Sequence, residues 1–572
     1  MIRAVGGYDD RPWLAGYPPD VPTECSFPQV ALTRLLDDAA HAYPNNVAIS
    51  CLGNRMTYHA LQDSVDRFAA GLAELGVGPL ARVAIVLPNC PQHVIAFFAV
   101  LRLGAIVVHC NPLAATEELR SQLIDSGASV VVCLDRIAPA MLEVRADTRV
   151  RAIVVTSLAD GLSRTARGRL ELPLPMTRNR KARMVAEVPE DPAIHRFRAL
   201  VRTGTAARQA ALSPAEDVAV LQYTSGTTAE PKAAMLSHAN LVANTHQIRM
   251  WFPGAVPGKE VTLATVPLFH VYGLTLCMLT TILLGGRVVL LPKFDVDALL
   301  DAIDDERPTL FPAVPPIFRA LVDHPKLRRH DLSTIRACVS GAMKLPVDLV
   351  ERFEKTADVP LIEGYGMTET SPVTHCVPLT GDRKPGSVGL PLPGTFARIV
   401  DPDQPSVDMP VGEPGELAVK GPQVFLGYWS RDAAVVPPTV DGWWLTGDIA
   451  IMDQAGWFRI VDRKKDLIIA GGFNISPTEV EQVILRIPGV TECCVAGLPD
   501  RNRGETVKAY VVAPDGNVTE DEVKAACAAS LSAYKVPKLV EFRDELPRTA
   551  VGKALRRLLV AEELATEEAP SS

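Results

Sequence analysis

The chain has 572 residues, 48% of them hydrophobic and 22% charged, which predicts more than one domain and a large buried core. Its net charge of −8 argues against a general nucleic-acid binder. The 11 cysteines are scattered without a Cys-x-x-Cys pair, which favours a reducing, cytoplasmic setting and offers neither a disulfide framework nor a zinc site.

Neither the N-terminal residues nor the most apolar stretch of the sequence has the pattern of a targeting signal or a membrane span. The first 13 residues lack the apolar core of a signal peptide. The most apolar stretch, from Val271 to Leu291, is interrupted by Gly285, Gly286 and Arg287. We therefore expect a buried helix and strand there, and no membrane span.

The first 133 residues alternate helical and extended patterns, which predicts parallel sheets covered on both faces. Thr57 is placed to cap the longest of these helices, and Gly76 to end it. The expected elements are helix 29–42, strand 47–51, helix 58–75, strand 82–87, helix 91–103, strand 106–109, helix 115–126 and strand 129–133.

A basic stretch over residues 163–184 departs from this alternation. It contains six arginines and Lys181 against one acid, Glu171, and two prolines interrupt it. The simplest expectation is a solvated surface loop. The apolar residues between the charges keep a second interpretation open, in which the stretch meets an anionic lipid surface at about 1 kcal/mol per basic residue.

A loop rich in hydroxyl groups follows the predicted buried strand Asp217–Tyr223 and precedes a helix that begins at Ser237. Hydroxyls, a glycine, exposed N–H groups and a lysine suit the binding of phosphate oxygens. A polar turn is the plain alternative, and the Walker pattern is absent. The residues concerned are Thr224, Ser225, Gly226, Thr227, Thr228 and Lys232.

The spacing of this loop closely resembles the phosphate loop of adenylate-forming enzymes. This superfamily comprises acyl-CoA synthetases, peptide-synthetase adenylation domains and beetle luciferases. The resemblance implies that the loop holds the β- and γ-phosphates of ATP. Two departures are Ala229 and Ala233, where relatives usually carry glycine. Alanine would be strained at either position if the backbone needed a positive φ.

The next predicted strand, Val261–Pro267, leads to Phe269, His270 and Gly273. A lone histidine is more often structural than catalytic. Ligands of open α/β sheets gather, however, at the carboxyl ends of strands. Acyl-CoA synthetases have a similar Pro-Leu-Phe-His segment beside the acyl pocket, which implies a place in that pocket for His270.

Two further strand ends carry nucleotide-site candidates. The strand 335–339 ends in Ser340, Gly341 and Ala342, and the segment 361–370 resembles the second signature of the superfamily. Its glycines let a planar ring approach the backbone, Tyr365 can stack on that ring, and the carboxylate of Glu369 suits Mg²⁺. The resemblance assigns Glu369, with Thr224, to the metal, and the following residues to the nucleotide: Gly341, Ala342, Glu363, Gly364, Tyr365, Gly366, Met367 and Thr368.

The span from Asp441 to Lys465 resembles the long signature of fatty acyl-CoA synthetases. The resemblance assigns Asp448 and Arg463 to the ribose hydroxyls, and a carboxylate and a guanidinium suit the two hydroxyls of a diol. It adds Ile460 to the nucleotide-binding residues and places Lys465 at the hinge of the family.

Beyond this hinge the chain predicts a small α+β domain. Ser476 and Thr519 each precede a glutamate by three residues, which is the pattern of a capping box. Strands are expected at 490–497, 508–513 and 538–542. Pro547, Thr549, Gly552 and Lys553 match the C-terminal signature of the superfamily, which implies that Lys553 is catalytic.

The predicted fold is therefore α/β, with a large N-terminal domain (1–461) of parallel-rich, helix-covered sheets and a small mobile α+β domain (462–572) that begins at the hinge 462–466. Within the superfamily, the chain resembles the medium- to long-chain fatty acyl-CoA synthetases. The resemblance implies ATP, Mg²⁺ and coenzyme A, and two half-reactions: a carboxylate forms acyl-AMP and pyrophosphate, and the CoA thiol then displaces AMP. Peripheral membrane contact and a homodimer are further expectations.

In such enzymes the small domain rotates between the two steps. The rotation would replace Lys553 by the segment Gly471, Gly472 and Phe473, whose glycines permit close passage of pantetheine. Some relatives carry a lysine where this chain has Ile469.

Four alternatives stay open. A fatty acyl-AMP ligase would pass the acyl group to a carrier protein, and a related CoA ligase would activate aromatic or other acids. A luciferase-like monooxygenase would oxidise its own adenylate. A nucleotide-binding regulator would not turn over, which the joint presence of Glu369, Asp448, Arg463 and Lys553 argues against.

Overall fold

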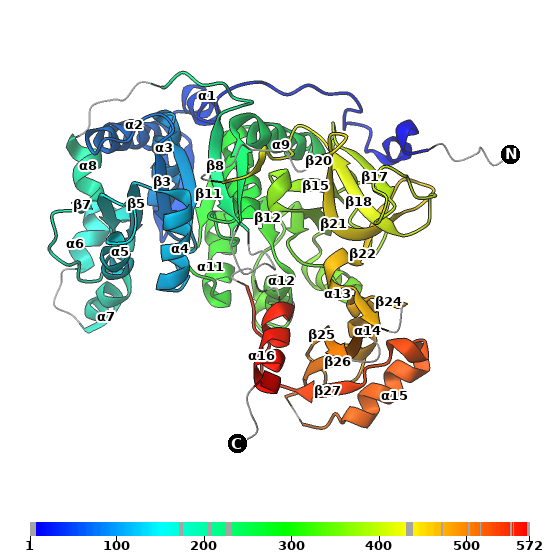
Figure 1. Ribbon diagram of the computed structural model, residues 1–572. Helices are drawn as coiled ribbons and strands as arrows, with labels where there is room; N and C mark the ends of the chain where they lie inside the picture. The colour runs from blue at the N-terminus through cyan, green and yellow to red at the C-terminus, as the bar shows by residue number, and fades with distance from the viewer. Residues whose placement is uncertain are drawn as a thin grey trace. The chain divides into compact units, whose positions relative to one another are not determined.

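The computed structural model describes residues 7–170, 175–203, 209–224, 232–430, 439–470, 473–500, 504–514, 516–549, 552 and 554–568. The chain divides into two compact units (Figure 1). The larger unit comprises Tyr17–Thr395 and Gly421–Pro438, and the smaller unit comprises Met1–Gly16, Phe396–Lys420 and Thr439–Ser572. The predicted α/β class is confirmed, because the larger unit contains two mostly parallel sheets and the smaller unit an α+β region.

One sheet of the larger unit has eight strands, and the five neighbouring pairs among β8, β4, β3, β5, β6 and β7 are parallel. In spatial order the strands are β19 (Gly427–Tyr428), β9 (Ala233–Ser237), β8 (Val218–Tyr223), β4 (Ile106–His109), β3 (Arg82–Val86), β5 (Val130–Leu134), β6 (Ala152–Thr156) and β7 (Ile194–Arg196).

Apolar residues on both faces explain why this sheet is covered on both sides. Ala84 and Val86 of β3 pack with Leu123 of α4 and Met141 of α5, whereas the alternate residues of β3 face the opposite side. That side is covered by α3 and α8, which contact α2. The helices are α2 (Tyr58–Glu74), α3 (Pro91–Arg102), α4 (Thr116–Ser126), α5 (Ala138–Arg145) and α8 (Phe197–Thr203).

The second sheet of the larger unit has nine strands, and β1, β11, β10, β12, β13 and β14 run parallel to their neighbours within that set. In spatial order the strands are β16 (Leu390–Pro391), β15 (Val373–Cys376), β14 (Leu361–Gly366), β13 (Ala337–Ser340), β12 (Leu310–Ala313), β10 (Val261–Ala264), β11 (Arg287–Leu290), β1 (Val47–Cys51) and β2 (Asn54–Thr57).

Most helices around this sheet follow one of its strands in the chain, whereas α1 precedes β1 and α9 precedes β10. Between β10 and β11 the predicted buried helix is a π-helical segment, Gly273–Leu279, continued by α10. The other helices are α1 (Arg34–Ala42), α9 (His238–Trp251), α10 (Thr280–Leu283), α11 (Val296–Glu306), α12 (Pro315–Val322) and α13 (Val347–Ala357).

The smaller unit contains two sheets. An antiparallel sheet is built from β17 (Phe396–Val400), β18 (Gly415–Lys420), β20 (Thr439–Val440), β21 (Trp443–Met452) and β22 (Phe458–Arg463). The other contains β23 (Ile468–Ala470), β24 (Phe473–Ile475), β25 (Glu492–Asp500), β26 (Gly504–Val512) and β27 (Leu539–Phe542). Helices α14 (Pro477–Ile484) and α15 (Glu520–Ser530) cover one face of this second sheet, and α16 (Arg556–Glu568) the other.

Several local predictions are confirmed by the caps. Thr57 caps α2, Ser237 caps α9, and Thr519 forms a capping box with Glu522 at α15. Ser476 caps α14, but the predicted box is only half formed, because the carboxylate of Glu479 accepts from Lys535. The strand β9 between Lys232 and Ser237 was not predicted, because five buried residues in a row show no period-2 alternation.

The basic stretch 163–184 differs from the expected loop. Residues Arg164–Leu170 form α6 and residues Pro175–Met184 form α7, while 171–174 lie outside the described residues. Arginine, alanine and leucine favour a helix, and Pro175 occupies the first helical position, where proline is tolerated. Leu170 and Met184 are buried against Ala159 and Leu162, so these two apolar side chains serve packing.

Candidate active site

The two ends of the predicted phosphate loop are joined in the larger unit. The amide of Thr224 donates to the carbonyl of Lys232 at 3.0 Å, and its hydroxyl donates to the same oxygen at 3.2 Å. The strands on either side pair at Tyr223 and Ala233. The loop is therefore the connection of a β-hairpin. Its members Ser225, Gly226, Thr227 and Thr228 lie outside the described residues, as does Ala229.

Glu369 lies in the short turn Thr368–Thr370 that follows β14. Its carboxylate accepts a hydrogen bond from the hydroxyl of Tyr428 at 2.6 Å, and its carbonyl accepts from the amide of Phe425 at 2.8 Å. The ammonium of Lys232 lies 5.6 Å from the centre of the Tyr428 ring. One aromatic side chain thus connects the predicted metal ligand to the lysine of the phosphate loop.

Tyr428 is a site residue that the sequence patterns did not indicate. It belongs to the two-residue strand β19, which pairs with β9 immediately after the phosphate loop. Burial, and secondarily Glu369, raises the pKa of Tyr428 well above its usual value, so the phenol stays protonated and donates to Glu369. A two-residue strand has no periodicity that could have placed it beside Glu369.

The predicted nucleotide residues 341–342 and 363–368 lie at or just beyond the carboxyl ends of two neighbouring parallel strands. Ser340 of β13 is in register with Glu363 of β14. Glu363 is 8% exposed, and burial raises the pKa of its carboxyl to about 8. It accepts a hydrogen bond from the amide of Leu345 at 3.2 Å. Ala342 has a φ of 65°, a left-handed conformation that is uncommon outside glycine.

The two glycines of β14 differ in why they are needed. A Cβ on Gly366 would lie 1.9 Å from the carbonyl oxygen of Pro372, so the neighbouring backbone excludes a side chain. A Cβ on Gly364 would make an ordinary contact, at 3.6 Å from Val339. Close backbone packing therefore accounts for Gly366, and the predicted approach of a planar ligand remains a reason for Gly364. The adjacent amide of Met367 donates to the carbonyl of Pro372 at 3.0 Å.

His270 is half-buried and precedes the π-helical segment. Its Nδ1 accepts a hydrogen bond from the amide of Tyr272 at 3.2 Å, and burial lowers its pKa to about 4, so the ring is neutral near pH 7. The Tyr272 ring also abuts Gly341, where a Cβ would lie 3.1 Å from the ring. The structure thus places the predicted acyl-pocket segment beside the predicted nucleotide residue Gly341.

In the smaller unit, Asp448 and Arg463 are in register on the antiparallel strands β21 and β22. The Arg463 Nε lies 3.1 Å from a carboxylate oxygen of Asp448, which is 3% exposed. Ile460 pairs with Ala450 on the same two strands. The predicted ribose-binding pair is therefore brought together by sheet register.

Charged contacts surround the predicted hinge. The ammonium of Lys464 lies 2.9 Å from a carboxylate oxygen of Glu416. The buried carboxylate of Asp462 accepts hydrogen bonds from the hydroxyl of Ser476 at 2.5 Å and from the amide of Thr478 at 2.9 Å. Lys465 lies in the short turn Lys464–Asp466.

Arg556, at the start of α16, is a hinge contact that sequence analysis missed. Its guanidinium donates to Asp466 at 2.6 Å, to Glu481 at 2.8 Å and to the carbonyl of Val495 at 2.6 Å. Its acidic partners raise its pKa against the effect of burial. This arginine ties the end of the hinge to the helix that follows the C-terminal signature.

The remaining predicted residues are only partly described. Lys553, Gly471 and Gly472 lie outside the described residues, and Phe473 begins β24. Around Lys553, the amide of Gly552 donates to Thr549 at 2.8 Å and the amide of Leu555 to Pro547 at 2.7 Å. The second of these bonds joins described residues on the two sides of Lys553 at the C-terminal signature.

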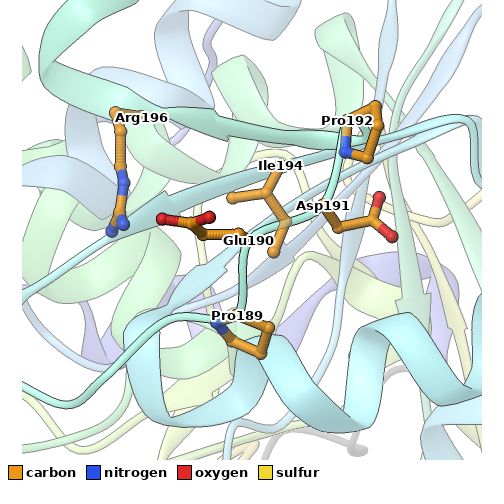
Figure 2. A pocket seen from close by; sticks show the side chains of 6 residues that line it. All are labelled: Pro189, Glu190, Asp191, Pro192, Ile194 and Arg196. Atoms are coloured by element: carbon orange, nitrogen blue, oxygen red, sulfur yellow. The ribbon is translucent and has the colours of Figure 1, made fainter.

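A separate hollow of about 450 Å³ lies on the larger unit beside β7 (Figure 2). Glu190 and Asp191 point away from each other in it, and Asp191 is engaged by the amide of Ala193 at 2.8 Å. Because no predicted site residue lines it and its carboxylates do not converge, we do not consider it the active site. Its lining consists of Pro189, Glu190, Asp191, Pro192, Ile194 and Arg196.

Comparisons with known proteins agree with the motifs. Residues 36–429 match the family of AMP-binding enzymes, and residues 479–553 match the AMP-binding enzyme C-terminal domain. The chain is 43% identical to a long-chain-fatty-acid–CoA ligase of Bacillus subtilis over 97% of this chain and 98% of the relative. It is 40% identical to the long-chain-fatty-acid–CoA ligase of Escherichia coli over 96% of this chain and 97% of the relative.

Among solved structures, the ATP-bound MatB of Rhodopseudomonas palustris superposes with a TM-score of 0.80 at 29% identity, covering 93% of this chain and 98% of that chain. No helix in the described part of the chain combines the length and the apolar character of a transmembrane span.

Proposed function

The chain belongs to the AMP-binding enzyme family, and from this premise we propose that it is a long-chain fatty acid–CoA ligase. The observation that carries the proposal is 43% identity to a ligase of this kind over nearly the full length of both chains. The reaction is an acid–thiol ligation driven by ATP.

The first half-reaction joins the acid to AMP. A carboxylate oxygen of the fatty acid attacks the α-phosphorus of ATP, the bond to the β-phosphate oxygen breaks, and pyrophosphate leaves. Both reactants are anionic, so the protein has to offset their repulsion. We assign Lys553 to the carboxylate and α-phosphate, and Thr224, Ser225, Thr227, Thr228 and Lys232 to the β- and γ-phosphates.

The carboxylate of Glu369 suits a Mg²⁺ ion. Hard oxygen ligands are what Mg²⁺ prefers, and it binds through one or two carboxylates together with substrate phosphates. The neutral phenol of Tyr428 orients this carboxylate without cancelling its charge. When bound, the ion would neutralise phosphate charge. Its proposed protein ligands are Glu369 and the hydroxyl of Thr224.

The ribose is assigned to Asp448 and Arg463, whose 3.1 Å contact orients the carboxylate for the diol. The base is assigned to the strand ends that carry Gly341, Ala342 and the segment 363–368, with Tyr365 stacking on it. Ile460 adds an apolar contact to the nucleotide.

The second half-reaction transfers the acyl group to coenzyme A. The thiolate sulfur attacks the acyl carbon, the bond to the AMP phosphate oxygen breaks, and AMP leaves while the thiol proton passes to solvent. We assign the pantetheine to the segment Gly471–Phe473, and the change between half-reactions to a domain boundary at 462–466, where Lys465 acts as the hinge.

The decisive experiment is mass spectrometry of the products from purified protein, ATP, Mg²⁺ and a panel of C4–C18 and aromatic acids, with and without CoA. Acyl-AMP without CoA and acyl-CoA with it, highest for long chains, are expected. Adenylate that persists despite CoA would point to a carrier-protein acceptor, and a preference for aromatic acids would replace the fatty-acid assignment.

Peripheral membrane contact through α6 and α7 is a further part of the proposal. The basic composition of 163–184 suits an anionic lipid surface, whereas the burial of Leu170 and Met184 leaves them unavailable for insertion. Pelleting with anionic liposomes should fall when the arginines of this stretch are neutralised. Unchanged pelleting would contradict it.

Cytoplasmic location and a homodimer complete the proposal. The scattered cysteines, which form no Cys-x-x-Cys pair, are the feature that favours a reducing compartment. Sedimentation equilibrium of the purified protein would distinguish a dimer from a monomer.

A further inference from the structure

A continuous chain of buried polar side chains runs from the core of the eight-stranded sheet to the segment that carries His270. His93 of α3, His109 of β4 and Gln222 of β8 are 0%, 2% and 4% exposed. The His93 Nδ1 lies 3.1 Å from the carbonyl of Leu87, and its Nε2 lies 3.3 Å from the Nε2 of His109. The His109 Nδ1 lies 3.1 Å from the Gln222 Oε1, and the Gln222 Nε2 donates to the carbonyl of Phe269 at 2.8 Å.

The last link of this chain joins the two sheets of the larger unit. Gln222 is the second-last residue of β8, two residues before the predicted phosphate loop begins at Thr224. Phe269 precedes His270 on the segment that follows β10 of the nine-stranded sheet. A second amide holds the same segment nearby, because Asn89 donates to Ala264 and Val266, both at 3.0 Å, and accepts from the amide of Leu268 at 2.8 Å. Gln222 is the side chain that holds the residue next to His270.

The number of ring N–H groups on the two histidines determines the orientation of the Gln222 amide. Three contacts, from Leu87 through both rings to the Gln222 oxygen, each require one ring N–H. Burial lowers the pKa of His93 to about 4 and that of His109 to about 3, so both rings are neutral near pH 7. A neutral imidazole carries one N–H, so the two rings together supply only two N–H groups for these three contacts. One contact must therefore join two lone pairs.

The distances indicate which contact that is. The contact between the two rings, at 3.3 Å, is the longest of the four. If the missing proton falls there, His109 carries its proton on Nδ1 and donates to the Gln222 oxygen, which leaves the Gln222 NH₂ facing Phe269. If His109 were protonated on Nε2 instead, the amide would turn and its oxygen would face the carbonyl oxygen of Phe269.

We propose that Gln222 is a positioning residue that holds the Phe269–His270 segment beside the phosphate-loop strand, and that the Nδ1 proton of His109 keeps its amide in the required orientation. The inference rests on the proposed function, in which this segment borders the acyl chain. It adds a residue that sets the place of the fatty acid without touching it.

The kinetic test compares Gln222→Met with a matched control, Gln247→Met. Gln247 is another buried glutamine of the larger unit, 0% exposed, whose amide donates to the carbonyl of Pro393 at 2.9 Å. Adenylation is measured by pyrophosphate release with the fatty acid and ATP varied separately. Loss of one hydrogen bond at Phe269 should raise the KM for the acid about fivefold to tenfold in Gln222→Met and leave the KM for ATP within about twofold. Gln247→Met should change neither KM, although both variants lower the Tm.

His109→Phe tests the orienting role, because it removes the Nδ1 donor and keeps an aromatic ring stacked beside Phe97, which lies 5.8 Å from the His109 ring. It should raise the acid KM as Gln222→Met does, and the double variant should show no further rise. An equal rise in both KM values, an unchanged acid KM in folded Gln222→Met, or additive effects in the double variant would overturn the proposal.

A measurement on the wild-type protein covers the case in which these variants do not fold. Nitrogen-15 NMR of histidine-labelled protein should show His109 protonated at Nδ1, whereas an Nε2-protonated His109 would overturn the proposal. This measurement needs no turnover. If the wild-type protein forms no acyl-AMP, the proposed function is refuted. The protonated nitrogen of His109 would still show whether its Nδ1 proton orients the Gln222 amide.

Discussion

The two units hold their predicted nucleotide-site carboxylates in different ways. In the smaller unit, the predicted ribose carboxylate Asp448 is paired with Arg463. Two carboxylates at or beside the predicted hinge are likewise paired with cations, Glu416 with Lys464 and Asp466 with Arg556. In the larger unit, Glu369 is held by the neutral phenol of Tyr428, and Glu363 by the amide of Leu345.

The difference matches the chemistry proposed for each region. A carboxylate paired with a guanidinium is fixed in direction and nearly neutral as a pair, which suits hydrogen bonding to a sugar diol. Glu369, which a neutral phenol holds, has no cationic partner in that contact to offset its charge, which suits a divalent cation, whereas burial keeps Glu363 largely protonated near pH 7. In the proposed function, the same chemical group therefore serves recognition in one unit and cation binding in the other.

Lys553→Ala should give the largest effect, because it removes the cation that we propose for the transition state of adenylation. We expect adenylation to slow by about 10²–10³-fold, measured by pyrophosphate release. Lys524→Ala, which removes a surface lysine paired with Glu520 on α15, is the matched control and should leave both half-reactions unchanged.

Glu369→Gln and Asp448→Asn directly test the difference between the carboxylates of the two units. The first should slow adenylation by about 10²-fold and raise the Mg²⁺ concentration needed for half-maximal rate, because it removes the cation ligand. The second should raise the KM for ATP without moving the Mg²⁺ requirement. A shift of the Mg²⁺ requirement in Asp448→Asn alone would reverse the roles assigned here.

Lys465→Pro tests the hinge of the smaller unit. Proline restricts φ, so the backbone change proposed between the half-reactions should be blocked while the first half-reaction stays within about threefold. Acyl-CoA formation from preformed acyl-AMP should fall by more than about tenfold. Equal loss of both half-reactions would count against a hinge at this residue.

Tyr428→Phe sharpens the comparison within the larger unit. It removes the hydrogen bond to Glu369 and keeps the carboxylate charge, so adenylation should fall only about threefold. The Mg²⁺ titration should change in the same direction as in Glu369→Gln but less. An effect as large as that of Glu369→Gln would mean that the phenol does more than orient the carboxylate.

Glu363→Gln should give the smallest effect, and thermal stability is the property that reports it. The carboxyl has a pKa of about 8 in the folded chain, above its unfolded value, so the folded state binds more protons between about pH 4.5 and 8. The stability that this group contributes is complete below about pH 4.5 and is lost as the pH rises through about 8. Thermal unfolding across this range should show a shallower decline in Glu363→Gln, and an identical decline would contradict the assignment.

Much of the fold could be predicted from local patterns. The caps at Thr57, Ser237 and Thr519 depend on residues three positions apart, and the strand at Val47–Cys51 depends on its own composition. The superfamily signatures are also contiguous, so their presence did not depend on knowing the fold. The roles assigned to their residues, Lys553 among them, remain predictions.

What the sequence by itself determined was therefore the family, the order of most elements and the candidate residues. Tertiary structure alone decided which distant groups meet: Tyr428 with Glu369, Arg556 with Asp466, and Gln222 with His109. It also decided that 163–184 contains two helices with Leu170 and Met184 buried. The physical reason is that periodicity reports which face of an element is apolar, whereas strand register and burial depend on segments far away in the chain.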